Sequence, residues 1–440
     1  MRERRFGLAD CNNFFVSCER RMDSSLENKP VVVLSNNDGC VISRSNEAKR
    51  MGIKMCDPYF KIKYTLDMHG VEVRSSNMRI YRQISAEVME RLKKWTDMTE
   101  MYSIDESFFN MAIYSVRDPV DYCVKIRKDI LGNCHIPISI GIAPTKTLAK
   151  LGTEYAKVTP STDGVFWVSA KYYRDASFMS QFRCIDIWGI GRKTSAKLSR
   201  FKVENASDFA AKNDIWIKKR FGISAVYCAW ELRGQPVYSL SSDSRPPKSI
   251  MVSRSFGEPL LTFSELLTPL SCFAASAAKQ LRESGQAASR MTAFIATSRF
   301  VEETKRYDRS ITVELESKTY TDADFINMAE KALHELFKPG YQYKRAGIIL
   351  SGLGNSTPFE QTNLFDSAHD DKTFAVSKTV DKINRMCDFS LIKPAALFST
   401  PGDKLEWKSR SQFLSNSEPM PDAQTRRLRF QCHADDYRDQ

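Results

Sequence analysis

Met101-Tyr-Ser-Ile-Asp-Glu-Ser-Phe-Phe-Asn-Met111 is the stretch that decides the fold. Tyr102 and Ile104 alternate with their neighbours, and apolar residues resume after the adjacent acids Asp105 and Glu106. This period of two predicts a β-hairpin that carries two carboxylates at its tip. Because adjacent carboxylates repel each other, they need either solvent or a cation between them. A surface hairpin is the simpler interpretation, unless another acid lies in a matching place.

Asp10 is that further acid. The mostly apolar run over residues 6–10 predicts a strand that ends in Asp10, followed by a helix with Asn12 or Asn13 as its N-cap. Three carboxylates at adjacent strand ends suit Mg²⁺, and two such ions about 4 Å apart can activate one oxygen and stabilise the leaving one. The acids therefore indicate a two-metal site for nucleotidyl transfer.

The expected order of elements explains how Asp10 reaches the hairpin. Strands and helices are predicted in the order β, α, β, β, α, β, over residues 6–10, 79–95, 101–111 (the hairpin), 119–131 and 136–142, and another helix over 145–155 follows. This ferredoxin-like order places the first and third strands side by side at the centre of a sheet. The compact insert over residues 13–77 is expected to hold a strand at 31–34, a return strand from Val41 and a short helix from Ser43 to Met51.

Two later stretches carry further information. Asp186-Ile-Trp-Gly-Ile-Gly-Arg-Lys-Thr-Ser-Ala-Lys-Leu198 is typical of a helix-hairpin-helix motif, whose backbone N–H groups hold a DNA phosphate without reading bases. The alternative is an ordinary tight turn between packed helices. After the Ser- and Pro-rich linker 239–249, the β, α, β, β, α, β order is expected again, over residues 250–257, 264–284, 290–300, 310–316, 322–337 and 341–350. A last helix is expected near 374–386.

Composition narrows the class of protein. A chain of 440 residues with 42% apolar residues predicts several globular domains. The excess of 65 basic over 53 acidic residues, a net charge of +12, favours a polyanionic partner. Eleven scattered cysteines, without a CxxC pair or a zinc-type cluster, indicate reduced thiols and a cytoplasmic location. The start does not resemble a signal peptide, and no window approaches 18 apolar residues.

Several motifs together resemble the Y-family translesion DNA polymerases, in particular the catalytic subunit of bacterial DNA polymerase V, the UmuC/MucB/ImpB type. The resemblance runs from about residue 5 to about residue 366. It rests on Ala9-Asp-Cys-Asn-Asn-Phe-Phe-Val-Ser-Cys-Glu19, Lys29-Pro-Val-Val-Val-Leu-Ser-Asn-Asn-Asp-Gly39, Tyr102-Ser-Ile-Asp-Glu106 and Gly141-Ile-Ala-Pro-Thr-Lys-Thr-Leu-Ala-Lys150.

The resemblance implies an α+β fold of the right-hand polymerase type and an error-prone DNA-directed DNA polymerase that acts opposite damaged bases in an SOS-type response. It implies a ferredoxin-like palm, small fingers, a helical thumb, a βαββαβ little finger and a mostly polar C-terminal tail. In this sequence the expected parts are palm 1–12 and 78–169, fingers 13–77, thumb 170–238, linker 239–249, little finger 250–352 and tail 353–440.

Site residues follow from the same resemblance. Asp10, Asp105 and Glu106 are the expected catalytic acids and, with the backbone carbonyl of Cys11, the ligands of two Mg²⁺ ions. The resemblance assigns Ser43, Lys49 and Lys157 to the triphosphate, and Phe15 to the steric gate that excludes a ribose 2′-hydroxyl; plain core packing is the alternative for Phe15. A Tyr or Arg often stands where this chain has Asn46 or Lys49, and lysine lacks the bidentate fork of arginine. The expected thumb contacts to DNA are Gly189, Gly191, Arg192 and Lys193.

The resemblance also implies partners: primer–template DNA, dNTPs, the β sliding clamp, a processed UmuD-type dimer and a RecA filament. Gln361-Thr-Asn-Leu-Phe365 resembles a clamp-binding peptide, with Gln361, Leu364 and Phe365 as its contacts. Of the segment with which the family commonly ends, only Leu405-Glu-Trp407 and Phe413-Leu-Ser415 are echoed here.

Two other classes remain open from the residues alone. A nucleotide cyclase also uses a ferredoxin-like palm with two metals, but would leave the helix-hairpin-helix motif and the second basic domain unexplained. A catalytically silent DNA- or clamp-binding accessory would not need all three acids.

Overall fold

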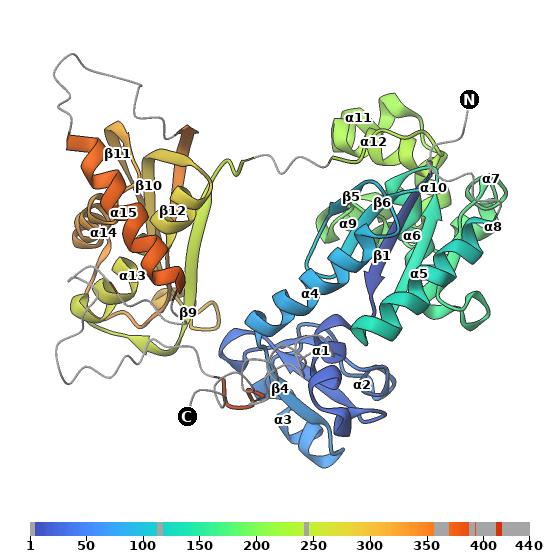
Figure 1. Cartoon of the computed structure of the whole chain (residues 1–440), viewed down its shortest axis with the longest axis horizontal. Coiled ribbons are helices and arrows are strands. Elements are labelled where there is room, and N and C mark those ends of the chain that lie inside the picture. The colour runs from blue at the N-terminus through green and yellow to red at the C-terminus, as the bar shows by residue number, and fades with distance from the viewer. Residues whose placement is uncertain are drawn as a thin grey trace, which may run out of the picture. The chain divides into compact units, whose positions relative to one another are not determined.

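The computed structural model describes residues 5–111, 118–241, 246–355, 369–386, 392 and 411–415. The chain forms two compact units (Figure 1). The first takes residues 1–244 together with 412–440, and the second takes residues 245–411. The described residues 412–415, which follow the second unit in the sequence, therefore belong to the first unit.

A five-stranded sheet lies at the centre of the first unit. Its order is β5-β6-β1-β7-β8, with β1 Phe6–Cys11, β5 Thr99–Met101, β6 Glu106–Asn110, β7 Ile138–Ala143 and β8 Val165–Trp167. The predicted hairpin is formed by β5 and β6, and β1 pairs antiparallel with β6 so that Asp10 lies opposite Glu106. The prediction that the first and third strands of this sheet lie side by side is confirmed by the pairing of β1 with β6.

Helices cover both faces of this sheet. Alternate residues of β1 and β6 face opposite sides: Ala9 and Phe109 join a core with α4 (Met78–Lys93) and α5 (Pro119–Cys134), while Leu8 and Phe108 join a core with α6 (Lys146–Val158). Gly141 allows α6 to approach closely, because a Cβ at this position would lie 2.0 Å from the carbonyl oxygen of Ala149. The sheet therefore holds α6 directly beside the end of β1.

The expected fingers region contains its own sheet, in the order β3-β2-β4. Its elements are α1 Phe14–Met22, η1 Ser24–Leu26, β2 Val31–Leu34, η2 Asn36–Asp38, β3 Val41–Arg44, α2 Asn46–Arg50, α3 Tyr59–Met68 and β4 Glu72–Ser75. The helix expected from Ser43 begins instead at Asn46, because the Ser45 hydroxyl accepts the N–H of Ala48 and Ser43 pairs with Val33 in the sheet. Asn13 is the residue before α1, although its side chain makes no capping hydrogen bond.

Short helices follow β8 in the expected thumb. They are α7 Ala170–Tyr173, α8 Ala176–Met179, η4 Cys184–Asp186, α9 Arg192–Ser199, α10 Ala206–Ala210, α11 Asp214–Phe221 and α12 Ile223–Leu232, and η3 Pro160–Thr162 precedes β8. Their apolar side chains share the core on the α6 side of the central sheet.

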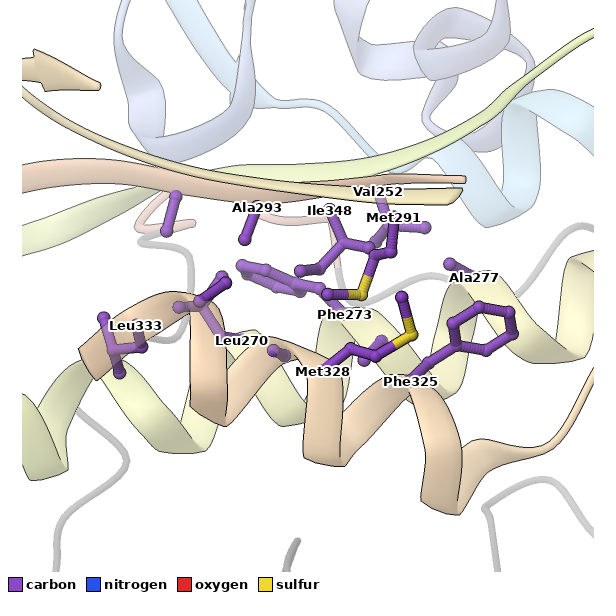
Figure 2. Packing of buried hydrophobic residues seen from close by; sticks show 14 of the residues in the cluster. Val252, Leu270, Phe273, Ala277, Met291, Ala293, Phe325, Met328, Leu333 and Ile348 are labelled. Carbon is purple, nitrogen blue, oxygen red and sulfur yellow. The ribbon is translucent and has the colours of Figure 1, made fainter. Parts of the chain in front are cut away.

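The second unit is a four-stranded antiparallel sheet with two helices packed on it (Figure 2). Its elements are β9 Ile250–Leu260, α13 Phe263–Glu283, β10 Gln286–Thr297, η5 Glu303–Lys305, β11 Asp308–Thr319, α14 Asp322–Leu336 and β12 Tyr343–Asn355. The strand order is β11-β10-β12-β9, so the first strand lies at an edge rather than at the centre. The last predicted helix is α15, His369–Met386, and Arg282 ties it to α13 through an ion pair with Asp381.

The α+β fold is thus confirmed, while the division into palm, fingers, thumb, little finger and tail stays a prediction. Among the described residues, no helix has both the length and the apolar character needed to cross a lipid bilayer.

Candidate active site

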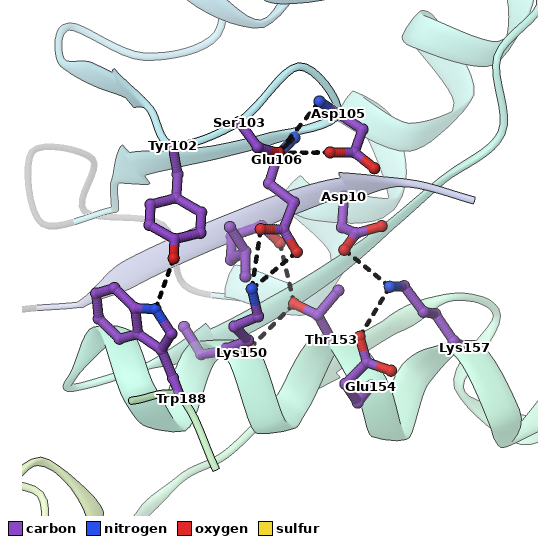
Figure 3. Close-up of polar contacts among 12 residues, drawn as sticks. Asp10, Tyr102, Ser103, Asp105, Glu106, Lys150, Thr153, Glu154, Lys157 and Trp188 are labelled. Atoms are coloured by element: carbon purple, nitrogen blue, oxygen red, sulfur yellow. Dashed lines mark hydrogen bonds and ion pairs between the residues drawn. The ribbon is translucent and has the colours of Figure 1, made fainter. Parts of the chain in front are cut away.

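One face of α6 presents three lysines to three acids from the central sheet. Lys146, Lys150 and Lys157 are separated by four and seven residues, which places them on the same side of a helix. Lys150 Nζ lies 2.9 Å from a Glu106 oxygen and Lys157 Nζ lies 2.8 Å from Asp10 Oδ2 (Figure 3). Lys146 pairs in the same way with Glu100, at 2.7 Å. The lysines neutralise carboxylates that would otherwise repel one another.

Asp10 and Glu106 lie opposite each other across β1 and β6, and their pKa values move apart. Burial raises the pKa of Asp10 to about 8, the adjacent Glu106 raises it too, and Lys157 counters part of the rise. Burial alone would raise the pKa of Glu106, but the neighbouring Asp10 and Lys150 outweigh it and lower the pKa. A carboxyl such as Asp10, only 5% exposed, gains most from a cation that compensates for the lost water.

Asp105 lies at the same edge of the sheet and has a separate partner. Its Oδ1 accepts a hydrogen bond from the Ser103 hydroxyl at 2.5 Å, and its backbone carbonyl accepts the N–H of Cys11 at 2.9 Å. Within the described ranges, no group of three or more His, Cys, Asp or Glu side chains surrounds a common point as metal ligands would. The three acids are brought to one edge, but each is turned to its own partner.

The donor set at this edge nevertheless fits Mg²⁺. All three side chains offer carboxylate oxygens, the ligands that this ion prefers. Lys157 and Lys150 already place positive charge against Asp10 and Glu106. A cation bound to Asp10 would take over the role of Lys157.

The residues expected to hold the triphosphate lie around Asp10. The Ser43 hydroxyl donates to the carbonyl of Asn13 at 3.3 Å. Burial, then the positive charges of Arg44 and Lys157, lower the pKa of Lys49, although much of its side chain is exposed. Two further cations therefore act on Lys49, and a cluster of positive charge favours binding of a polyanion. The contribution of Arg44 was not predicted from the sequence.

Phe15 lies half-buried and stacks on Tyr81, with ring centroids 4.9 Å apart and planes at 23°. Tyr81 is fully buried, and its hydroxyl donates to Glu19 Oε1 at 2.5 Å. Two residues before Phe15, the Asn13 side-chain amide donates a separate hydrogen bond to Asn46 Oδ1 at 3.1 Å. The expected gate ring is thus backed by a buried aromatic ring that is itself fixed by a carboxylate.

The candidate thumb contacts surround the start of α9. Gly189 has a φ of 87°, which favours glycine, and Gly191 precedes the helix with a φ of −84°. Arg192 and Lys193 follow on the surface. Gln361, Leu364 and Phe365 lie outside the described residues.

Several residues of the site were not found from the sequence. Lys150 stands in a recognised motif, but its pairing with Glu106 requires knowing that α6 packs beside the hairpin. The spacing of the three lysines was a usable signal, since it predicts a cationic helix face. Trp188 Nε1 donates to the Tyr102 hydroxyl at 2.8 Å and so ties the hairpin to the segment before α9; no local pattern indicates that contact.

Solved structures similar to this chain define its class. A Y-family DNA polymerase chimera of Dbh and Dpo4 superposes with a TM-score of 0.66 at 21% identity, covering 80% of this chain and 99% of the other. An insertion ternary complex of Dbh DNA polymerase gives a TM-score of 0.53 at 20% identity, covering 79% and 98%. At these identities the likeness is one of fold, and the fold is that of a Y-family DNA polymerase.

Sequence comparison identifies the family. Residues 9–154 match the model of the impB/mucB/samB family, and residues 247–364 match the model of its C-terminal domain. Protein UmuC of Salmonella typhimurium is 35% identical over 413 residues, and protein MucB of Escherichia coli is 32% identical over 412; each alignment covers 93% of this chain and 96% of the relative. The chain belongs to the impB/mucB/samB family, as the motifs predicted.

If the three acids bind Mg²⁺, the ion should stabilise the protein against heat. Binding to the native state alone adds about 1.4 kcal/mol when the free ion is at ten times its dissociation constant. We expect Mg²⁺ to raise the melting temperature of the unmodified chain but not of Asp10→Asn, measured by calorimetry without DNA. The exposed Asp67 provides a control, since Asp67→Asn should keep the shift. An equal shift in Asp10→Asn would place the ion elsewhere.

Proposed function

We propose that this chain is an error-prone translesion DNA polymerase that transfers nucleotides from dNTPs to a primer 3′-hydroxyl opposite damaged template bases. The observation that carries the proposal is the register of the central sheet, in which buried Asp10 lies opposite Glu106, with Asp105 beside them. The cations Lys49 and Lys157 act at the same place, as a triphosphate site requires. Family membership and the polymerase fold support the same activity.

In the proposed mechanism, Asp10, Asp105, Glu106 and the Cys11 carbonyl hold two Mg²⁺ ions. The ions would supply the Lewis acidity that activates the 3′-hydroxyl oxygen and neutralises charge on the leaving pyrophosphate. Lys157, released from Asp10, would be free to place its ammonium against the triphosphate. Ser43 and Lys49 hold the same group from the fingers side, and Lys150 keeps the Glu106 carboxylate ionised by its adjacent charge.

Phe15 sets the sugar specificity of this proposed site. Its ring cannot retreat into the fold, because Tyr81 is stacked behind it. A ribose 2′-hydroxyl would therefore meet a ring that is held in place by Tyr81.

DNA would be held mainly through its phosphates. The backbone N–H groups at the start of α9, with Arg192 and Lys193 beside them, suit a phosphate and carry no information about the base. Contacts that do not depend on the base are compatible with a damaged template. The net charge of +12 supports a polyanionic partner.

Primer extension past a lesion tests the proposed function. The chain, supplied with Mg²⁺ and dNTPs, is expected to extend a primer across an abasic site, alone or after addition of a processed UmuD-type dimer and a RecA filament. Four reactions, with neither protein, with either one, or with both, also show whether these partners are required. The proposal would be overturned if none of the four reactions extended the primer on the undamaged template or on the damaged one.

We further propose that Gln361, Leu364 and Phe365 dock on the β sliding clamp. Adjacent apolar residues in a polar stretch suit a pocket on a partner, and tethering raises the local concentration of polymerase at the primer end. Changing Leu364 and Phe365 to alanine should abolish clamp stimulation while basal extension and melting temperature remain. Phe359→Ala, in the same polar stretch, is the control. Loss of stability with retained clamp binding in a pull-down would show that the pair belongs to a core instead.

A further inference from the structure

The last described segment of the chain, residues 411–415, returns to the fingers sheet and lies beside β4, where Figure 1 draws it in red. Among the described strands, the order β3-β2-β4 leaves one edge of β4 without a neighbour. Ser75, the last residue of β4, donates its N–H to the carbonyl of Phe413 at 3.0 Å, and its hydroxyl accepts the N–H of Phe413 at 2.9 Å. The segment is thus bound at the outer edge of β4 by one backbone hydrogen bond and one hydrogen bond to the Ser75 side chain.

A buried acid makes this docking specific. Asp38 Oδ2 accepts the N–H of Gln412 at 2.8 Å, while its Oδ1 accepts the Ser75 hydroxyl at 2.6 Å. Asp38 is 9% exposed and Ser75 is 1% exposed, so water is a poor substitute for these bonds. Asp38 also has a φ of 51°, a backbone conformation that is strained for a residue other than glycine. A buried acid that hydrogen-bonds both β4 and the segment indicates a specific binding site for residues 412–413.

Phe413 supplies the apolar anchor. Its ring packs against the fingers core and meets Tyr59 edge-on, with centroids 5.7 Å apart. Leu414, the next residue, is 45% exposed and makes no such contribution to the core. The two residues therefore offer a matched pair for substitution.

Ser415 extends the contact toward Phe15. Burial raises the pKa of Glu19, and the side chains of Tyr81 and Ser415 beside its carboxylate counter part of that rise. Glu19 Oε1 accepts the Tyr81 hydroxyl, while Glu19 Oε2 and the Ser415 hydroxyl are buried without a hydrogen-bond partner. Ser415 thus lies beside Glu19, whose carboxylate holds the Tyr81 hydroxyl, and Tyr81 stacks on the Phe15 ring.

We propose that residues 412–415 form an intramolecular latch, which closes the open edge of the fingers sheet and positions the Phe15 ring through Glu19 and Tyr81. The partner of this edge of β4 is the chain's own segment. The part of the inference that concerns Phe15 rests on the proposed polymerase function, whereas the docking itself does not.

Hydrogen exchange tests the docking without any assay of activity. In the full-length chain, Phe413→Ala should speed exchange of the Ser75 amide at least about tenfold, because the latch opens more often. Leu414→Ala should leave that rate unchanged. A synthetic peptide of residues 408–418 added to Phe413→Ala should restore slow exchange, and the same peptide with alanine at 413 should not. An unchanged Ser75 rate in Phe413→Ala, or equal action of the two peptides, overturns the latch.

Nucleotide selection tests the path to Phe15. Phe413→Ala should raise the ratio of ribonucleotide to deoxyribonucleotide incorporation about threefold, and this effect should vanish in a Phe15→Ala background, as coupled positions require. An unchanged ratio in Phe413→Ala that shows fast Ser75 exchange overturns the coupling. The same effect in both backgrounds also overturns it. Because exchange is read without nucleotides, failure of the polymerase proposal is recognised separately by the absence of any incorporation.

Discussion

Asp10→Asn is expected to reduce Mg²⁺-dependent primer extension at least about a thousandfold while leaving DNA affinity near that of the unmodified chain. Asparagine has nearly the size of aspartate but no negative charge, so it can neither balance a metal ion nor bridge two of them. Asp105→Asn should give the same result, since Asp105 lies at the same edge of the sheet. DNA affinity should persist, because Arg192 and Lys193, the cations expected to contact phosphate, lie at the start of α9 and not among the acids.

The measurement is single-turnover extension at saturating DNA, with affinity followed separately by fluorescence anisotropy. Asp67→Asn serves again as the control, since its carboxylate is exposed on α3. Substantial incorporation by either Asp10→Asn or Asp105→Asn would refute the assignment of the metal site. A parallel loss of DNA binding would show that the substitution disturbed more than the acids.

Phe15→Ala is expected to raise the ratio of ribonucleotide to deoxyribonucleotide incorporation at least about tenfold, which corresponds to about 1.4 kcal/mol of lost discrimination. The ring is supported by Tyr81 and cannot yield to a 2′-hydroxyl, so its removal opens space where the sugar would lie. The effect should appear mainly in the ribonucleotide kinetics, because a deoxyribose has no group to clash.

Competing dNTP and rNTP kinetics give the ratio directly. Phe60→Ala is a suitable control, because Phe60 is a fingers aromatic with 69% of its surface exposed. A folded, active Phe15→Ala with an unchanged ratio would mean that the ring is part of the core and that another residue selects the sugar.

The central sheet and its acids could be predicted because their signals are local. Alternation through Tyr102 and Ile104, and a strand that ends in Asp10, need only a few neighbouring residues to be read. The order of elements then implied that β1 and β6 are neighbours, and the observed pairing of Asp10 with Glu106 follows from it.

The misplaced start of α2 shows where local signals are ambiguous. Ser43 and Ser45 are both acceptable N-caps, and only the bond from the Ala48 N–H to Ser45, with the pairing of β3 to β2, decides between them. The pairing of Lys150 with Glu106 and of Asp381 with Arg282 depends on packing between distant elements. No reading of neighbouring residues supplies such contacts.

The return of residues 412–415 to the first unit has a consequence for the order of events during synthesis. Roughly 170 residues separate Ser241 from Ser415, and at about 5–20 residues per second the ribosome needs on the order of ten to thirty-five seconds to make them. During that time the second unit can fold completely. The outer edge of β4 still lacks residues 412–415, and Asp38 still lacks the hydrogen bond from the Gln412 N–H. The nascent chain thus carries an open strand edge, the feature that invites pairing with another chain. The part of the protein that is made first is therefore completed by residues that are made after the whole second unit.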